Sequence, residues 1–440
     1  MKRREFLHRA AGAGAVLAGA SAHVSGVAAD AAKRAAEGAA KGAAKGAAKV
    51  LVVGGGYGGA TAAKYIRLWG GANIDVTLVE PNAHFVSCPL SNLVLGGSRK
   101  IDDLTLDYRG LERYGVRIVR DRVEAIDPGN RTARLAGGET LSYERLVLSP
   151  GVDFMWDRLP GMQSADARER ILHAWKAGPQ TTALRAQLEA MPDGGTYVMS
   201  VPPAPYRCPP GPYERACQVA HYFSRSKPKS KVLLLDANPD VVSKGALFKK
   251  VWKERYGDII EYRPGFLTVA VDAGARIAIS ELGDQVKADV LNVIPPQRAG
   301  EVAVGAGLAN ANGRWCAVDF LTFESTAAPG VHVLGDAIQT APLMPKSAHM
   351  ANQHAKVCAA AVVDLLADRA PNPQPMLTNT CYSFVSDRDV IHVASVHAYD
   401  AAKKTVLAVP GSGGLSAAPS ELEGTYATSW ARNIWADSLG

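Results

Sequence analysis

Cys208 lies in the most unusual stretch of the sequence, a proline-rich turn that reads YRCPPGPYERAC over 206–217. The turn follows an apolar run at 196–201 and precedes an amphipathic segment. A strand, a tight turn and a helix start are the place where a dinucleotide fold puts its phosphate loop. Proline has no N–H and fixes φ, so this turn suits phosphate poorly. The stretch is predicted to hold a reactive sulfur atom instead, and the lost glycine loop argues against a nicotinamide cofactor.

Six cysteines are present, and none of them forms a CxxC or CxxCH motif. The spacing therefore excludes a covalent c-type haem on this chain and a zinc ribbon. In an exported protein the cysteines could form disulfides. Cys316 and Cys358 are predicted core residues, and the histidines show no metal-ligand spacing.

Three glycines, Gly54, Gly56 and Gly59, fit the GxGxxG pattern between a predicted strand at 49–53 and a predicted helix at 60–69. In this context the glycines allow the backbone to approach a pyrophosphate at the start of a helix. The motif predicts a dinucleotide-binding unit.

Five further positions are predicted to face the same cofactor: Glu80, Cys88, Ser149, Gly335 and Asp336. Glu80 ends the next strand, 21 residues after the last glycine, where an acid binds a ribose hydroxyl. Cys88 follows where the ring end should lie, although a buried free thiol is the alternative. Ser149 ends a strand that returns to the first sheet. Gly335 and Asp336 follow another strand, and Asp336 is either a ribityl ligand or a helix N-cap.

Several helices are expected from apolar spacing. Residues 165–190 are predicted to form one helix, with Trp175 on its apolar face. A second helix is predicted to start at Lys346 and run to Ala367, with its N-terminus aimed at a flavin pyrimidine. Residues 379–440 are expected to form short strands and an aromatic end that contains Trp430.

The composition is that of a soluble globular protein, with 47% hydrophobic and 21% charged residues in a chain of 440. Most of the +7 net charge lies in the first 49 residues, so a nucleic-acid surface is poorly supported. Arg3 and Arg4 precede a short, weakly apolar run, which resembles a twin-arginine export signal. A basic helix that stays on the protein is the alternative. No segment is long and apolar enough to be transmembrane.

The predicted fold class is α/β, with two Rossmann-like three-layer domains of the glutathione-reductase type and an α+β C-terminal domain. The predicted boundaries are an export signal at 1–29, a low-complexity Ala/Gly/Lys tether at 30–48, a discontinuous FAD-binding domain at 49–160 and 300–370, a second dinucleotide-like domain at 161–299 that carries Cys208, and a C-terminal domain at 371–440 that carries Cys381.

With these landmarks, residues 49–440 resemble the flavoprotein subunit of flavocytochrome c sulfide dehydrogenases, within the disulfide flavoproteins that also include the sulfide:quinone oxidoreductases. The resemblance rests on eight stretches: GGATAAKYIRL (58–68), CPLSN (88–92), HAWKAG (173–178), YRCPPGPYERA (206–216), IPPQRAG (294–300), TFES (322–325), MPKS (344–347) and NTCYS (379–383).

The resemblance implies that Cys88 attaches FAD through a thioether and that Cys208 and Cys381 form a redox disulfide beside the flavin. A purely structural disulfide is the alternative. Glu214 would match the acid near that disulfide, although the dipole of a first helical turn favours a carboxylate in any case. Trp430 would lie near the flavin or fill the core. Cys217 departs from the family pattern and could compete for Cys208.

Hydrosulfide would attack the disulfide and leave one persulfide and one thiolate, from which two electrons pass to FAD. The start of the helix after Cys208 is expected to favour the thiolate form of this cysteine. A c-type cytochrome subunit carrying the haem is the implied partner, in the periplasm. The alternatives are a membrane-associated sulfide:quinone oxidoreductase and a non-catalytic sulfur carrier.

Overall fold

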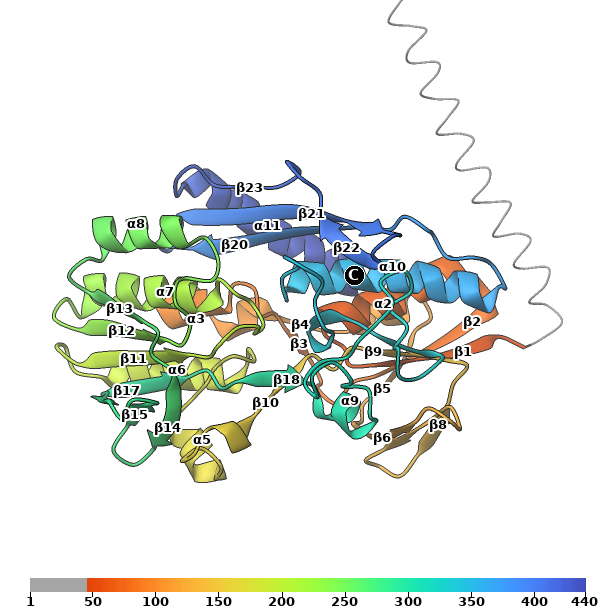
Figure 1. The fold of residues 1–440 in the computed structure, drawn as a ribbon, viewed down its shortest axis with the longest axis horizontal. Coiled ribbons are helices and arrows are strands. Elements are labelled where there is room, and N and C mark those ends of the chain that lie inside the picture. Colours follow the sequence, from red (N-terminus) through yellow and green to blue (C-terminus); the bar gives the residue numbers. More distant parts are fainter. Residues whose placement is uncertain (1–45) are drawn as a thin grey trace, which may run out of the picture.

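The computed structural model describes residues 46–440 (Figure 1). The predicted export signal and all but the end of the predicted tether lie outside the described residues. No helix within 46–440 combines the length and apolar composition that crossing a bilayer requires.

The first sheet has five parallel strands in the order β19–β9–β1–β2–β5. Its strands are β1 (Ala48–Val53), β2 (Ile74–Val79), β5 (Arg117–Val119), β9 (Arg145–Leu148) and β19 (Val331–Val333). The continuous apolar runs of β1 and β9 are buried, as expected for a sheet covered on both faces. Helices α2 (Tyr57–Gly70) and α10 (Ala348–Leu366) pack together above it, and the meander of β6 (Val123–Asp127), β7 (Thr132–Leu135) and β8 (Thr140–Ser142) lies below it (Figure 1).

The second sheet is also parallel, in the order β13–β12–β11–β17. Its strands are β11 (Thr196–Val201), β12 (Lys231–Asp236), β13 (Ile260–Pro264) and β17 (Val290–Val293). One face shares a core with α6 (Pro179–Ala190), α7 (Gly211–Ser226) and α8 (Gly245–Arg255). The other face is covered by α5 (Ala165–Arg170) and the hairpins of β14 (Thr268–Asp272), β15 (Ile277–Ser280) and β16 (Gln285–Lys287).

The two sheets are joined by an antiparallel pair, β10 (Val152–Phe154) and β18 (Gln297–Ala299). The shorter elements are β3 (Phe85–Val86), α3 (Ser91–Gly96), β4 (Thr105–Leu106), α4 (Arg109–Glu112) and α9 (Glu301–Gly305).

A C-terminal layer extends across the top of both halves (Figure 1). It contains β20 (Met376–Phe384), β21 (Val390–Asp400), β22 (Thr405–Ala408), β23 (Gly414–Leu415) and α11 (Glu421–Leu439). Strand β20 contacts α10 of the first half and α7 of the second. The end of α11 is bound to α2, where Lys64 Nζ donates to the Ala436 carbonyl at 2.9 Å and Thr61 Oγ1 donates to Ser438 Oγ at 2.9 Å. The layer therefore ties the two halves together.

One local prediction was wrong, and one segment had no assigned element. The single helix expected at 165–190 is broken into α5 and α6, because Ala174 (φ 45°) and Gly178 (φ 143°) have left-handed backbones and Pro179 begins α6. The aromatic end of the chain is the helix α11, capped by Ser420, whose Oγ accepts from Glu423 N at 3.2 Å. The S-x-x-E spacing of Ser420 and Glu423 is a capping-box signal that the sequence carries.

Gly59 fixes the approach of α2 to β1. A Cβ at this position would lie 1.8 Å from the carbonyl oxygen of Gly54. We predict that Gly59→Ala costs about 3 kcal/mol or more of folding stability. The new methyl group would clash with a backbone carbonyl, and neither the backbone of residue 59 nor that of Gly54 can shift freely. The melting temperature of the purified protein measures this. Gly274→Ala is the matched control, since its Cβ would meet nothing closer than 3.5 Å. Equal melting temperatures for both variants would contradict the prediction.

Candidate active site

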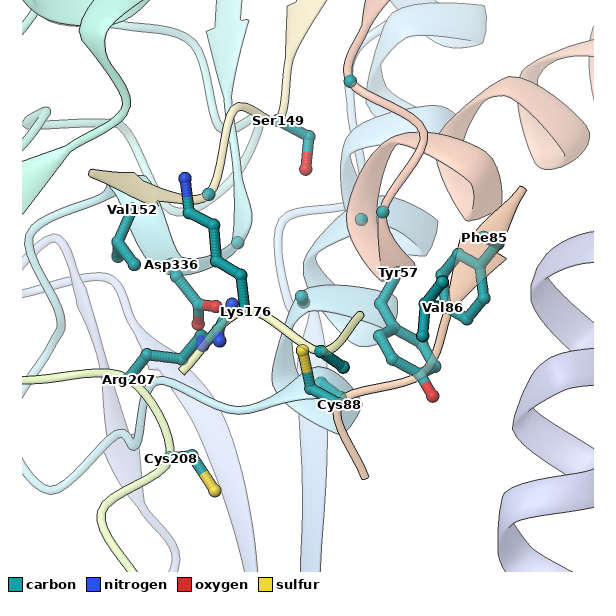
Figure 2. A pocket seen from close by; sticks show the side chains of 18 of the residues that line it. Tyr57, Phe85, Val86, Cys88, Ser149, Val152, Lys176, Arg207, Cys208 and Asp336 are labelled. Atoms are coloured by element: carbon teal, nitrogen blue, oxygen red, sulfur yellow. The ribbon is translucent and has the colours of Figure 1, made fainter. Parts of the chain in front are cut away.

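A cavity of about 1110 Å³ lies between the two halves and beneath the C-terminal layer. Its lining comes from the glycine motif of α2, the loop after β3, the start of α7, the start of α10, and β20. Figure 2 shows Cys88, Arg207, Cys208 and Asp336 in this cavity. Its volume is that of a large ligand site.

Gly54 and Gly56 line the cavity, whereas Gly59 does not and serves the packing of α2. Gly54 has a φ of 92°, and a Cβ here would lie 2.4 Å from the Ser149 carbonyl oxygen. A Cβ on Gly56 would meet nothing within 4 Å, so Gly56 leaves open room at the N-terminus of α2. This is the cradle that a pyrophosphate requires.

Glu80 lines the cavity at the end of β2 with a fixed carboxylate. Its Oε2 accepts from Gly55 N at 2.6 Å, and its Oε1 accepts from Asn82 N at 2.8 Å and Asn82 Nδ2 at 2.6 Å. The remaining lone pairs of the two oxygens leave acceptor capacity for a ribose hydroxyl.

Asp336, Gly335 and Ser149 also line the cavity, and a Cβ on Gly335 would lie 3.5 Å from Ser149 Oγ. Asp336 Oδ1 is buried and has no hydrogen-bond partner within residues 46–440. Burial raises the pKa of Asp336, and Arg207 and Lys346 counteract this. A buried carboxylate oxygen without a donor fits a hydroxyl group of a bound flavin nucleotide.

Lys346 was also predicted to contact the cofactor; it is absent from the lining of the cavity, and that contact stays a prediction. Its ammonium lies 3.6 Å from the centre of the Trp315 ring and donates to the carbonyls of Asp336 (2.8 Å) and Ile338 (2.6 Å). Helix α10 begins at Ala348, and Ser347 caps it, with Ser347 Oγ accepting from Met350 N at 3.0 Å. The lysine thus supports the backbone that carries Asp336.

Cys88 lies in the loop between β3 and α3, and its side chain enters the cavity (Figure 2). Arg207 faces it. Burial would lower the pKa of Arg207, but Cys88 and Asp336 together hold that pKa above its usual value. The sequence analysis missed Arg207, although it directly precedes Cys208.

Cys208 and Cys381, 173 residues apart in the chain, line the same cavity as the glycine motif. Cys208 has a left-handed backbone (φ 58°), held by its N–H donating to the Lys346 carbonyl at 2.8 Å. A Cβ on Gly211 would lie 2.9 Å from Cys208 Sγ and 2.8 Å from the Trp175 ring, so only glycine fits there. Both cysteines are free thiols in this structure, and their disulfide stays a prediction.

The electrostatics of Cys208 differ from the expectation that the start of α7 favours its thiolate. Burial raises the pKa of Cys208, and the negative charges of Glu214 and Cys381 raise it further. The pKa of Cys381 is also raised by burial, but Lys244 acts in the opposite direction. Desolvation and the carboxylate in the first turn of α7 therefore both act against the thiolate form of Cys208.

Glu214 lines the cavity from the first turn of α7. Its Oε1 accepts from Phe384 N at 2.8 Å and its Oε2 accepts from Asn92 Nδ2 at 2.9 Å. Burial raises the pKa of Glu214. The carboxylate thus joins three segments and shares the lining of the cavity with both cysteines.

Trp430 lines the cavity from α11, with its ring centre 5.8 Å from that of His349 and 6.1 Å from that of Tyr382. Cys217 is absent from the lining. It is fully buried, and its Sγ accepts from Trp252 Nε1 at 3.2 Å. Cys217 therefore belongs to the core of the second half.

Arg215 is a fully buried residue that the sequence analysis missed. Its guanidinium donates to Asn92 Oδ1, Asn292 Oδ1 and the carbonyls of His173 and Ala174 at 2.6–3.1 Å. It therefore holds the broken segment between α5 and α6 against α7. The neighbouring residue Glu214 was predicted from the family resemblance, but nothing in the sequence indicated that Arg215 would be buried with several hydrogen-bond partners.

Comparison with known proteins places these features in one family. Residues 181–295 match the central part of the sulfide dehydrogenase [flavocytochrome c] flavoprotein chain, and residues 373–439 match the flavin-binding part of flavocytochrome c sulphide dehydrogenase. Residues 48–188 match the pyridine nucleotide-disulphide oxidoreductases. The flavoprotein chain of Chlorobaculum thiosulfatiphilum is 59% identical over 46 residues, which is 94% of that sequence and 10% of this chain.

The chain belongs to the flavocytochrome c sulfide dehydrogenase flavoprotein family. This is an FAD-binding flavoprotein family, and the predicted relationship is confirmed.

More distant relatives are the sulfide:quinone oxidoreductases. The mitochondrial enzyme of Mus musculus is 25% identical over 300 residues, covering 66% of this chain and 65% of the relative. The chain thus spans just under two thirds of that relative's length. The structure of the sulfide:quinone oxidoreductase from Aquifex aeolicus has a TM-score of 0.68 at 19% identity, covering 89% of this chain and 92% of that one. The predicted fold class is confirmed, while the domain boundaries stay a prediction.

We predict that Gly56→Ala folds normally but retains several-fold less flavin per chain. Its φ of −69° suits alanine, and the added methyl group has room within the protein, but it enters the space of the pyrophosphate. Flavin absorbance relative to protein after purification measures the effect, with Gly274→Ala as the control. Full flavin content in Gly56→Ala would contradict the assignment of this end of the cavity.

Proposed function

We propose that this protein is an FAD-dependent sulfide dehydrogenase that oxidises sulfide at a Cys208–Cys381 redox disulfide and passes the electrons to a c-type cytochrome. One observation carries the proposal. Two cysteines that are distant in the chain line one cavity with the residues that fit a flavin dinucleotide. Membership of the sulfide dehydrogenase flavoprotein family supports the choice of substrate.

The residues of the cavity fit FAD. Gly54 and Gly56 would take the pyrophosphate, Glu80 a ribose hydroxyl of the adenosine part, and Asp336 a hydroxyl of the ribityl chain. Cys88 would hold the flavin covalently through a thioether, which keeps the cofactor from being lost outside the cytoplasm. When bound, FAD supplies an acceptor for two electrons.

Sulfide chemistry at the cysteines follows thiol–disulfide exchange. Attack by hydrosulfide forms one new S–S bond and breaks the Cys208–Cys381 bond. One cysteine then carries a persulfide and the other is released as a thiolate. Glu214 takes the proton of the attacking hydrosulfide, since its buried carboxylate lines the same cavity as both cysteines and raises the pKa of each. Reforming the disulfide releases the bound sulfur at the zero oxidation level and gives up one electron pair.

The electron acceptor is proposed to be a c-type cytochrome subunit. The sequence has no CxxCH motif, so the haem would be on the partner. The name of the relative from Chlorobaculum thiosulfatiphilum includes a flavocytochrome c, which supports this choice. A quinone acceptor is the second candidate, because the longer match is to sulfide:quinone oxidoreductases.

We further propose that the protein is exported to the periplasm by the twin-arginine route. The Arg3–Arg4 pair and the weakly apolar run that follows it support this location. Export of a protein that is already folded suits a cofactor enclosed between two halves of the chain.

Sulfide-dependent reduction of a purified c-type cytochrome tests the function. We predict that the native protein reduces the cytochrome, and that Cys381→Ser retains flavin but loses at least ~10³-fold in turnover because the disulfide is gone. Cys217→Ser is the matched control and should keep its activity, since this thiol lies in the core.

Three outcomes would count against parts of the proposal. Normal turnover in Cys381→Ser would make the pair structural. Reduction of a quinone but not of the cytochrome would favour the second candidate. Absence of flavin bleaching by sulfide in the native protein would leave a non-catalytic sulfur carrier.

The covalent link gives a separate prediction. Native protein precipitated with acid should stay yellow, whereas Cys88→Ser should release its flavin into the supernatant, because the thioether is proposed to form on Cys88. The flavin absorbance of pellet and supernatant decides this. Equal release from both proteins would reject the link.

A further inference from the structure

Lys244 is a buried lysine next to the strand that carries Cys381, and the site described above does not use it. It stands at the N-terminus of α8, with 6% of its surface exposed. Its Nζ donates to the Cys381 carbonyl at 2.9 Å, to Ser383 Oγ at 2.7 Å and to the Ile391 carbonyl at 3.4 Å. All three donors of the ammonium are thus directed from the second half of the protein into β20 and β21.

The ammonium has no carboxylate in direct contact within residues 46–440, since its three bonds go to neutral oxygens. A buried cation without an ion-pair partner is costly, and such groups are rare outside functional sites. Lys244 also has a left-handed backbone, with a φ of 58°. For a residue with a side chain this conformation is strained, and such strain gathers at functional sites.

Several charged or titratable groups face the sulfur of Cys381. Glu214 approaches from α7 and opposes a negative charge on Cys381, and Cys208 lies in the turn that precedes α7. His349 approaches from α10, where it accepts from Thr380 N at 2.9 Å, and burial lowers its pKa to about 4, so it is neutral near pH 7. Glu423 of α11 acts on Lys244 itself. Lys244 is therefore the positive charge that counteracts Glu214 at this cysteine.

We propose that Lys244 is a positioning residue that stabilises the anionic form of the Cys381 sulfur and so makes Cys381, rather than Cys208, the sulfur that carries the negative charge after disulfide cleavage. This inference deepens the proposed function and rests on it. Attack on Cys208 forms its persulfide, the S–S bond to Cys381 breaks, and the electron pair of that bond stays on Cys381. The charge then lies on the cysteine where the Lys244 ammonium counteracts Glu214.

The pH dependence follows from the same arrangement. Burial lowers the pKa of Lys244 to about 8, against the opposing effect of the nearby thiols and of Glu214. Lys244 is therefore charged below pH 8 and loses its charge as the pH rises above 8. Its support for the Cys381 thiolate should be fully present near pH 7 and should fade at more alkaline pH.

Alkylation of the reduced protein tests this without any sulfide turnover. The full-length, flavin-loaded chain is reduced with dithiothreitol, treated briefly with iodoacetamide from pH 6.5 to 10, and the peptides with Cys208 and Cys381 are quantified by mass spectrometry. In Lys244→Gln, which keeps a donor but loses the charge, alkylation of Cys381 at pH 7 should fall at least ~10-fold, and the difference should shrink above pH 8. Lys244→Arg should restore the rate. Lys253→Gln, an exposed lysine of the same helix, is the control.

An unchanged rate for Cys381 in a folded Lys244→Gln protein would overturn the proposal. An equal loss in the Gln and Arg variants at every pH would also overturn it, because the role would then be structural. Should the Gln variant fail to fold, the native protein alone decides: Cys381 should react about 10-fold faster than Cys208 at pH 7.5, and an equal or slower rate is the contrary result. Absence of sulfide turnover in the native protein would contradict the proposed function, whereas the alkylation rates would still report the effect of Lys244 on Cys381.

Discussion

The carboxylate of Glu214 joins the three segments that create the sulfur site. Through Phe384 it holds β20, through Asn92 it holds α3, and it belongs itself to the first turn of α7. Cys381 lies three residues before Phe384 and Cys208 lies six residues before Glu214. A buried acid that is satisfied by a distant backbone N–H thus helps to bring the two cysteines to one cavity. An unsatisfied carboxylate in this place would be costly, which makes the meeting of these segments specific.

Around this junction the two cysteines have different surroundings. Cys208 is held by a left-handed backbone, a hydrogen bond to the Lys346 carbonyl and the absence of a side chain at Gly211. Cys381 lies in regular strand pairing opposite Val393 of β21. Cys208 is thus rigidly held, and the Glu214 carboxylate acts on it. Cys381 has the Lys244 ammonium bound to its own carbonyl. Such asymmetry gives the two sulfur atoms distinct roles in an exchange reaction that would otherwise be symmetric.

Local sequence signals predicted the parts of the site that depend on local backbone. Gly54, Gly56 and Glu80 follow from a strand, a turn and a helix in order, and the structure places all three on the cavity. The partnership of Cys208 and Cys381 needed a family resemblance, because no local pattern relates residues so far apart. Lys244 and Arg215 could not be predicted, since a lone lysine or arginine in a helix is normally a solvated side chain. The single helix expected at 165–190 failed because helical spacing of apolar residues does not reveal a left-handed residue such as Ala174.

The attachment of α11 to α2 has a consequence for biogenesis. Helix α11 supplies Trp430 to the cavity, and its end is bound to Lys64 and Thr61 on the same helix that begins at the glycine motif. The first and the last of the described helices thus complete one wall together. During synthesis the cavity stays open on that side until α11 has left the ribosome. Closure of the cavity around the flavin therefore depends on a helix that is made about 360 residues after the glycine motif.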